Sequence, residues 1–162
     1  MKKNRSLAWD EALSTGENAR LQLPQIAHEF FHSGRSLIQR GASAAELHAF
    51  RLAAKRFRYT LELFRPLYGP GLEQRLECVR RIQSVLGKRQ DCEVLAQRLR
   101  ASAERTEGLR RALDKLERQG LKLEQEFRAY WLDEFDKPEE ELHWARYFAH
   151  RPAMTSSPEA GV

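Results

Sequence analysis

Four residues in the segment 47–64 combine side chains and spacing that suit a chain of negative charges. His48, Arg51, Lys55 and Arg58 are separated by steps of three, four and three residues. On an α-helix, each residue turns the chain by about 100° and advances it by about 1.5 Å, so the four side chains share one face. That face is about 15 Å long. Its arginines offer forked hydrogen-bond donors, its lysine a point charge and its histidine a titratable donor. We therefore predict a basic ridge, formed by these four residues, that binds a linear polyanion.

A solvated basic face without a ligand is the alternative interpretation of the same pattern. Long cationic side chains can cover apolar surface with their methylene stems while their charges stay in water. Like charges at this spacing cost about a few tenths of a kcal/mol per pair, which glutamates between them would relieve. Only Glu62 follows on this face.

Further cations lie outside the ridge. Lys88 and Arg89 precede Asp91, which we expect to cap a helix, so an anion there would also meet free backbone amides and a favourable helix dipole. Weaker candidates for the same binding role are Arg80, Arg81 and Arg35. We assign Tyr59 and Gln83 to structural hydrogen bonds between helices, as is usual for a buried phenol or amide.

The segment His28 to His32 has the HExxH form of zinc metalloproteases, in which two histidines bind the metal and the glutamate is the general base. A motif this short arises by chance, and the sequence contains no convincing third ligand. We find no Ser/His/Asp grouping, no phosphate-binding glycine loop and no paired carboxylates. We expect no catalytic residues, no metal and no cofactor.

The helix that positions the ridge has clear start and stop signals. Ser43 and Glu46 have the spacing of a capping box, in which each side chain satisfies a free amide of the first turn. Proline and glycine within 66–71 end the helix. An apolar stripe at steps of three and four residues runs between these signals, formed by Leu47, Phe50, Ala54, Phe57, Leu61 and Phe64.

Four further helices are expected, at about 18–40, 71–86, 91–103 and 108–136, from apolar periodicity and from glycine and proline stops. Pro24 marks either a start of the first helix near residue 23 or a kink in it. Gly87 ends one helix before Asp91 caps the next. The sequence thus predicts an all-α fold, an antiparallel bundle of about four to five helices.

This organisation divides the chain into three regions. Residues 1–16 form a loose N-terminal arm, residues 17–137 form the bundle, and residues 138–162 hold a short aromatic segment and a disordered tail. The aromatic segment contains Trp144 and Phe148 and predicts a short docking helix within 139–150.

Charge is distributed unevenly along the 162 residues, whose net charge is +5. Residues 1–103 carry 18 basic and 10 acidic side chains, a balance of +8, whereas residues 104–142 carry 8 and 12, a balance of −4. The early helices should therefore build the basic face. No apolar run approaches the ~20 residues that span a bilayer. We therefore expect a cytoplasmic protein with no membrane partner. Cys78 and Cys92 have no CxxC spacing, so we expect reduced structural thiols.

Two segments resemble the CHAD (conserved histidine α-helical domain) family. Residues 47–64, LHAFRLAAKRFRYTLELF, are similar to its pattern of His, Arg, Lys-Arg and Arg-Tyr before an acidic-aliphatic stretch, and residues 82–91, IQSVLGKRQD, are similar to its second element. The resemblance extends over roughly residues 20–135. It implies a helical bundle whose basic faces bind inorganic polyphosphate, with His48, Arg51, Lys55 and Arg58 as phosphate contacts.

A non-catalytic polyphosphate-binding protein, located in the cytoplasm and at polyphosphate granules, is the function that this resemblance favours. Two alternatives stay open, a non-specific nucleic-acid binder and a structural protein-interaction bundle. CHAD domains typically contain two related helical repeats, whereas this sequence has the ridge pattern once. We therefore expect a homodimer in which a two-fold axis brings two ridges together, with apolar contacts from helix stripes or from Trp144 to Phe148.

Overall fold

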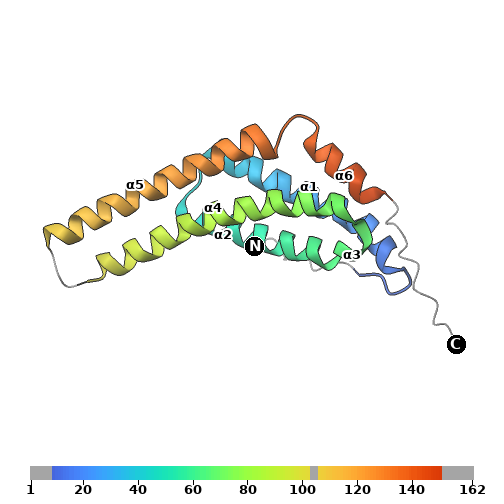
Figure 1. The fold of residues 1–162 in the computed structure, drawn as a ribbon, viewed down its shortest axis with the longest axis horizontal. Helices are drawn as coiled ribbons and strands as arrows, with labels where there is room; N and C mark the ends of the chain where they lie inside the picture. Colours follow the sequence, from blue (N-terminus) through green and yellow to red (C-terminus); the bar gives the residue numbers. More distant parts are fainter. Residues whose placement is uncertain (1–8, 103–105, 151–162) are drawn as a thin grey trace.

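The computed structural model describes residues 9–102 and 106–150, which are largely helical (Figure 1). The elements are α1 (Thr15–Arg40), α2 (Ala44–Leu63), α3 (Arg65–Tyr68), α4 (Pro70–Arg100), α5 (Glu107–Tyr130), the π-helical turn η1 (Trp131–Phe135) and α6 (Glu140–Ala149). The predicted all-α class is confirmed. Residues 1–8 of the expected arm and the expected disordered tail, 151–162, lie outside the described residues.

α1 begins well before Pro24, so a start near residue 23 is wrong. Ser14 and Glu17 form a capping box, with the Ser14 N–H donating to Glu17 Oε2 at 2.9 Å and the Glu17 N–H donating to Ser14 Oγ at 3.3 Å. The buried Asn18 amide donates to the Asp10 carbonyl oxygen at 2.9 Å, which attaches the end of the expected arm to the helix. These bonds stabilise the first turns, so the N–H that Pro24 lacks does not set the boundary.

α2 has the predicted start and the predicted buried stripe. The Ser43 N–H donates to Glu46 Oε2 at 2.9 Å, and this bond lowers the pKa of the Glu46 carboxyl. The Glu46 N–H donates to Ser43 Oγ at 3.2 Å. All six predicted stripe residues, Leu47 to Phe64, are buried. The capping box and the stripe together fix both the beginning of α2 and its rotation about its own axis.

α4 is a single 31-residue helix, and the predicted break between Gly87 and Asp91 is wrong. A helix-interior glycine costs only about 1 kcal/mol relative to alanine. Burial of Val85, Leu86 and Ala96 on either side of the glycine offsets that cost, because these residues pack against neighbouring helices. Asp91 is therefore no helix cap, and the amides of residues 88–91 lie inside a helix rather than free at its start.

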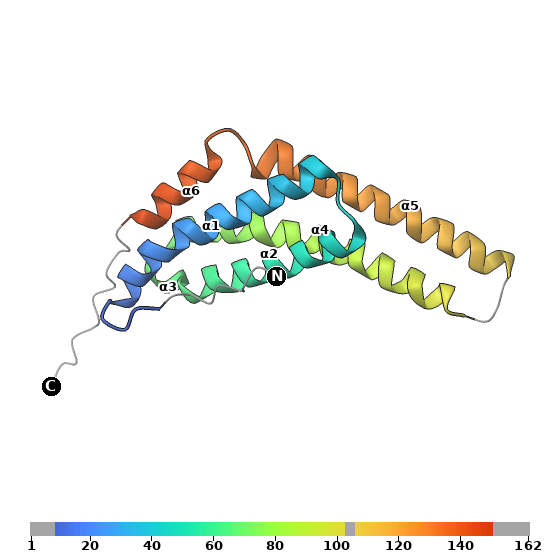
Figure 2. The ribbon, with the colours of Figure 1, turned by 180° about the vertical axis from the view of Figure 1, so that it is seen from behind.

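The helices form a compact body and a projecting hairpin, as two opposite views show (Figures 1 and 2). The body contains α1, α2, α3, α6 and the first half of α4. The second half of α4 and the first half of α5 extend beyond it as an αα-hairpin. Aromatic rings fill the centre of the body: the Phe30 ring centroid lies 4.6 Å from that of Phe57, and the Phe31 centroid lies 4.9 Å from that of Phe135.

α6 confirms the predicted docking helix. Its Trp144 and Phe148 side chains are 2% and 0% exposed, and they pack into the aromatic core of their own chain. The Tyr68 hydroxyl donates to the Phe148 carbonyl oxygen at 2.8 Å, and the Tyr147 hydroxyl donates to the Tyr68 carbonyl oxygen at 2.9 Å. The expectation that Trp144 and Phe148 contact a second copy is therefore not supported, because rings of α1, α2 and α3 already pack against them.

Gly34 on α1 is required by the close approach of Trp131, since a Cβ atom at this position would lie 2.1 Å from Trp131 Cη2. We predict that Gly34→Ala lowers the free energy of unfolding by roughly 1–3 kcal/mol or more, because the buried indole must move. Urea denaturation followed by circular dichroism measures this change. Gly108→Ala is the matched control, because its nearest neighbour would lie 3.8 Å away; equal losses in both variants would contradict the prediction.

Candidate functional site

The basic ridge of α2 (His48, Arg51, Lys55, Arg58) lies along the seam between α2 and α4. The two helices run in opposite directions, so residues late in α4 face residues early in α2. Gln90 is within hydrogen-bond distance of His48, with 3.0 Å between Oε1 and Nδ1. A Cβ atom on Gly87 would lie 3.8 Å from Arg51 Nε. Gly87 thus lies beside Arg51 and places no side chain against it.

The first part of the ridge carries charge that no carboxylate of the described residues neutralises. Within residues 9–102 and 106–150, no carboxylate oxygen lies within 4.0 Å of a side-chain nitrogen of Arg51 or Lys55. The partner of His48 is the neutral Gln90 amide. Lys55 is exposed, and His48 and Arg51 are partly exposed. This arrangement leaves two unpaired cations and one imidazole side by side, as binding of an anionic ligand requires.

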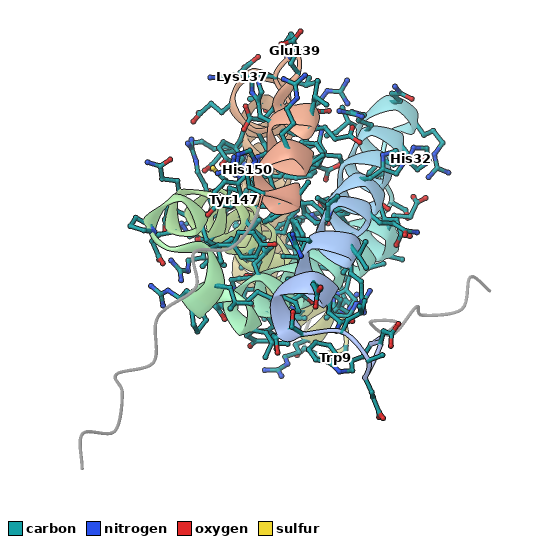
Figure 3. The ribbon with its side chains drawn as sticks, turned by 90° about the vertical axis from the view of Figure 1, so that its right-hand side faces the viewer. Trp9, His32, Lys137, Glu139, Tyr147 and His150 are labelled. Atoms are coloured by element: carbon teal, nitrogen blue, oxygen red, sulfur yellow. The ribbon has the colours of Figure 1, made fainter. Side chains whose placement is uncertain are left out.

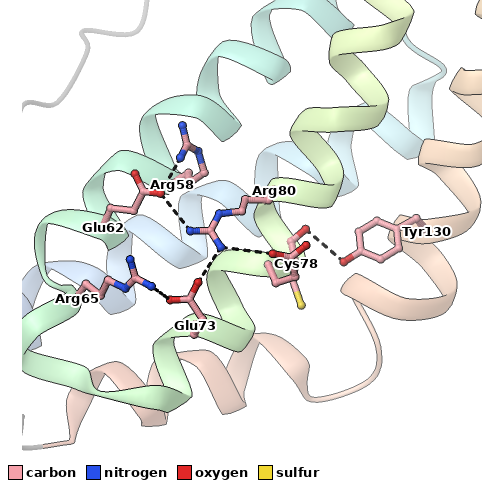
Figure 4. A network of polar contacts seen from close by, with 8 residues as sticks. Arg58, Glu62, Arg65, Glu73, Cys78, Arg80 and Tyr130 are labelled. Atoms are coloured by element: carbon pink, nitrogen blue, oxygen red, sulfur yellow. Dashed lines mark hydrogen bonds and ion pairs between the residues drawn. The ribbon is translucent and has the colours of Figure 1, made fainter.

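The other end of the ridge is different, because Arg58 belongs to a network of ion pairs (Figure 4). Arg58 Nη1 donates to Glu62 Oε1 at 2.6 Å, and Arg80 Nη2 of α4 lies 3.4 Å from the same oxygen. Arg80 Nη1 also donates to Glu73 Oε1 at 2.8 Å, which lowers the pKa of the Glu73 carboxyl. Arg65 is a further donor to Glu73.

The network is balanced in charge. Glu77 lies 3.4 Å from Arg80, so three arginines face three glutamates. The ridge therefore has an open cationic part, His48 to Lys55, and a closed part at Arg58, where carboxylates already accept from the arginines.

Tyr59 differs from the sequence-based expectation. It is 50% exposed rather than buried, and it lies beside the ridge. The Arg58 guanidinium carbon is 4.4 Å from its ring centroid, and Lys55 Nζ is 5.7 Å from it. The aromatic ring thus supports two ridge cations by cation–π contacts. Gln83, by contrast, is partly buried on α4, and its expected hydrogen bond between helices stays a prediction.

The additional basic residues that we singled out are not gathered on the ridge. Lys88 is exposed on α4, about 100° around the helix from Gly87. Arg89 faces α5 with a side chain that is 15% exposed, and Arg89 Nη1 donates to Glu93 Oε2 at 3.1 Å. Arg81 stacks on the Tyr130 ring at 4.1 Å and pairs with Glu134 at 2.6 Å. Only Arg80 joins the ridge, through Glu62.

Arg35 connects α1 to the segment after α5. Its Nε and Nη2 atoms donate to the two carboxylate oxygens of Asp136 at 2.8 and 2.6 Å, and Nη1 donates to Glu141 on α6. His28 shares that glutamate, with 2.5 Å between His28 Nδ1 and Glu141 Oε1. Arg35 therefore holds α1 against Asp136 and α6, and it is not part of the ridge.

The HExxH histidines lie on the outer face of α1, where His32 projects from the surface (Figure 3). The two rings stack with their centroids 6.3 Å apart. In the part of the chain that the structure describes, no group of three or more His, Cys, Asp or Glu side chains is placed to hold a metal ion.

The sequence analysis named Arg80 as a weaker candidate and Gln83 as a structural residue, but it did not place Gly87 and Gln90 beside the ridge. Arg80, Gln83, Gly87 and Gln90 follow one another at steps of three, four and three residues, the same spacing as the ridge. That spacing was the available signal, but the predicted break at Gly87 concealed it. The pairing of Arg80 with Glu62 has no local signal, because the two residues belong to different helices.

Comparison with known proteins adds one finding. The family model described as the CHAD domain matches residues 5–100, which is more than half of the chain. The match covers α1 to α4, including the ridge and the α4 side of the seam, and ends before α5. Searches of curated proteins and of solved structures found no match.

Some arginines form ion pairs between helices, whereas Arg51 does so with none of the described residues and can contact a ligand. We predict that Arg35→Gln lowers the free energy of unfolding by about 1–3 kcal/mol, because Asp136 loses two charge-assisted hydrogen bonds. Arg51→Gln should change it by less than about 0.5 kcal/mol, because Arg51 has no ion-pair partner within residues 9–102 and 106–150. Thermal and urea unfolding of both variants tests this contrast, and a larger loss for Arg51→Gln would show that the ridge is structural.

Proposed function

The chain belongs to the CHAD family, and from this premise we propose that it binds inorganic polyphosphate along the basic ridge without transforming it. CHAD domains are associated with polyphosphate binding. The observation that carries the proposal is the open part of the ridge, where Arg51 and Lys55 have no carboxylate partner among the described residues. A linear polyanion would meet successive cations about 5 Å apart along the axis of α2.

The α4 side of the seam supports this path for the ligand. Gln83 and Gln90 are neutral, and Gly87 has no side chain, so α4 places neither a negative charge nor bulk beside Arg51. Amide groups can donate hydrogen bonds to phosphate oxygens. The polyphosphate would therefore lie between cations from α2 and neutral hydrogen-bond donors from α4.

We also propose that the protein is not a polyphosphate hydrolase. Metal-assisted phosphoryl transfer requires carboxylates that hold divalent cations beside the substrate. The carboxylates nearest the ridge, Glu62 and Glu73, accept instead from Arg58, Arg80 and Arg65. Release of orthophosphate by the purified protein with Mg²⁺ or Mn²⁺ would contradict this part of the proposal.

Non-specific nucleic-acid binding is the second candidate, and the exposure of Tyr59 favours it, because bases stack on exposed aromatic rings. Two cations already lie over this ring, however. The ridge also has no Asn or Gln side chain of the kind that reads adenine edges. The third candidate is a structural bundle that binds another protein through the αα-hairpin.

Charge reversal in the open part tests the proposed site. We predict that Arg51→Glu/Lys55→Glu reduces polyphosphate binding by at least about a hundredfold while thermal unfolding is almost unchanged, because exposed charges contribute little to stability. Lys115→Glu/Lys122→Glu on α5 is the matched control with the same change in net charge. Calorimetry at several salt concentrations should show steeper salt dependence for the parent. Equal losses in both variants would place the site elsewhere.

Competition separates polyphosphate from nucleic acid. We predict that DNA at an equal concentration of phosphate charge displaces little of the bound polyphosphate, because the ridge contacts phosphates and two cations already lie over its aromatic ring, Tyr59. Fluorescence anisotropy with labelled polyphosphate measures the displacement. Ready displacement by DNA would favour the second candidate.

A homodimer and a cytoplasmic location are part of the proposal. The chain has one ridge, and a two-fold axis would double the number of cations. Since Trp144 is buried within its own chain, the apolar contacts must come from elsewhere, and Leu95 on the hairpin and Leu121 on α5 are 47% and 62% exposed. A hollow of about 240 Å³ between α1, α2 and α5 adjoins Leu121.

Among the described helices, none has the length and apolar character needed to cross a bilayer.

Sedimentation velocity tests the dimer. We predict dimers at tens of micromolar protein in the presence of polyphosphate, because the ligand neutralises the repulsion between two ridges. Replacement of Leu95 and Leu121 by glutamate should prevent dimerisation without unfolding the body. A parent protein that stays monomeric with and without polyphosphate would exclude this assembly.

A further inference from the structure

We propose that Glu62 is a resident anion that occupies Arg58 and Arg80 and thereby makes tight binding depend on the length of the phosphate chain. This inference rests on the polyphosphate binding proposed above. In the free protein, Glu62 would hold the two arginines across the seam, and a phosphate group of a long chain would displace it. Short chains would be restricted to the open part of the ridge.

The geometry gives Glu62 the position that a phosphate would take. Its Oε1 atom lies 2.6 Å from Arg58 Nη1 of the ridge and 3.4 Å from Arg80 Nη2 on the opposite side of the seam (Figure 4). Forked guanidinium groups bind carboxylate and phosphate oxygens in the same manner. One anionic oxygen therefore already bridges α2 and α4 at the end of the ligand path.

Glu62 lies where a helix does not favour it. It is the second-last residue of α2, at the negative end of the helix dipole, and the last turn of α2 contains no basic residue. Its favourable contacts come from Arg58 and Arg80 alone among the ion pairs of the described residues. Displacement by phosphate would also move its charge away from the carbonyl end of α2. The bond to Arg58 is therefore suited to exchange.

Arg80 has partners that remain when Glu62 leaves. Glu73 lies 2.8 Å and Glu77 3.4 Å from Arg80 Nη1. These carboxylates keep Arg80 in place on α4, and their negative charge opposes extension of a phosphate chain past Arg80. The ligand path would thus begin at His48, continue past Lys55 and end at the Arg58–Arg80 pair.

Two chain lengths and two matched variants test the inference. The probes are tripolyphosphate and a polyphosphate of about one hundred units, measured by calorimetry on the full chain. Glu62→Gln keeps the side-chain shape and releases Arg58, so we expect roughly tenfold tighter binding of tripolyphosphate. Glu77→Gln makes the same change in net charge within the same network, but Glu77 is 72% exposed and does not contact Arg58. We expect it to tighten binding by less than about threefold.

The same substitution in an Arg58→Gln variant tests whether Glu62→Gln changes the affinity through Arg58. In the Arg58→Gln variant, adding Glu62→Gln should tighten binding less than it does in the parent, because only Arg80 remains of the two arginines that Glu62 occupies. The gain from Glu62→Gln should also be smaller for long polyphosphate than for tripolyphosphate. Thermal unfolding of each variant confirms that the fold is retained.

The outcomes are distinguishable. A parent protein that binds neither probe would overturn the proposed function itself. If the parent binds but Glu62→Gln and Glu77→Gln have equal effects, Glu62 contributes only general charge and the inference is wrong. Weaker binding by Glu62→Gln would also overturn it, because Glu62 would then orient the arginines for the ligand rather than compete with it.

Discussion

The burial of the apolar stripe of α2 determines where the basic ridge lies. Phe50, Phe57 and Leu61 are buried against α1, α4 and the aromatic centre of the body. The ridge residues occupy the adjacent positions at the same spacing, so they must emerge at the edge of that contact. A rotation of α2 that buried the charges would expose the aromatic side chains at a large cost in free energy. The packing of the core therefore fixes the rotation of α2, and that rotation fixes where the cations lie.

Carboxylates divide the many basic residues of the chain into two groups. Arg35 bridges α1 to Asp136 and Glu141, Arg81 contacts the end of α5, and Arg89 pairs beside α5. These arginines stabilise contacts within the protein. Arg51 and Lys55 have no such partner among the described residues, and they lie one helix turn apart on α2, so their charge is available to a ligand. Net charge alone does not reveal this division, because it counts paired and unpaired cations alike.

Continuity of α4 connects the site to the rest of the molecule. One helix supplies Arg80 and Gly87 to the seam and then continues into the projecting hairpin. A rigid helix passes both regions, so a partner bound to the hairpin would be held at a fixed position relative to the ridge. The buried neighbours of Gly87, Val85 and Leu86, maintain that continuity where local propensity favours a break.

Local sequence determined the features that depend on residues close together in the chain. The capping box at Ser43, the apolar stripe of α2, the ridge at the same spacing and the short docking helix that contains Trp144 are all readable from steps of three and four residues. The helical class follows from the same patterns. Each of these features involves one helix turn or one helix face, for which neighbouring residues supply the decisive contacts.

Only the tertiary structure decided which charges stay free and which helices continue. Glu62 meets Arg80 across 18 positions of sequence, and Arg35 meets Asp136 across 101. Tyr59 is exposed because its position on α2 faces away from the buried stripe, although its residue type suggested burial. Packing on both faces of α4 overrides the glycine at position 87. These outcomes depend on distances between helices, which the folded arrangement sets and the spacing along one helix does not contain.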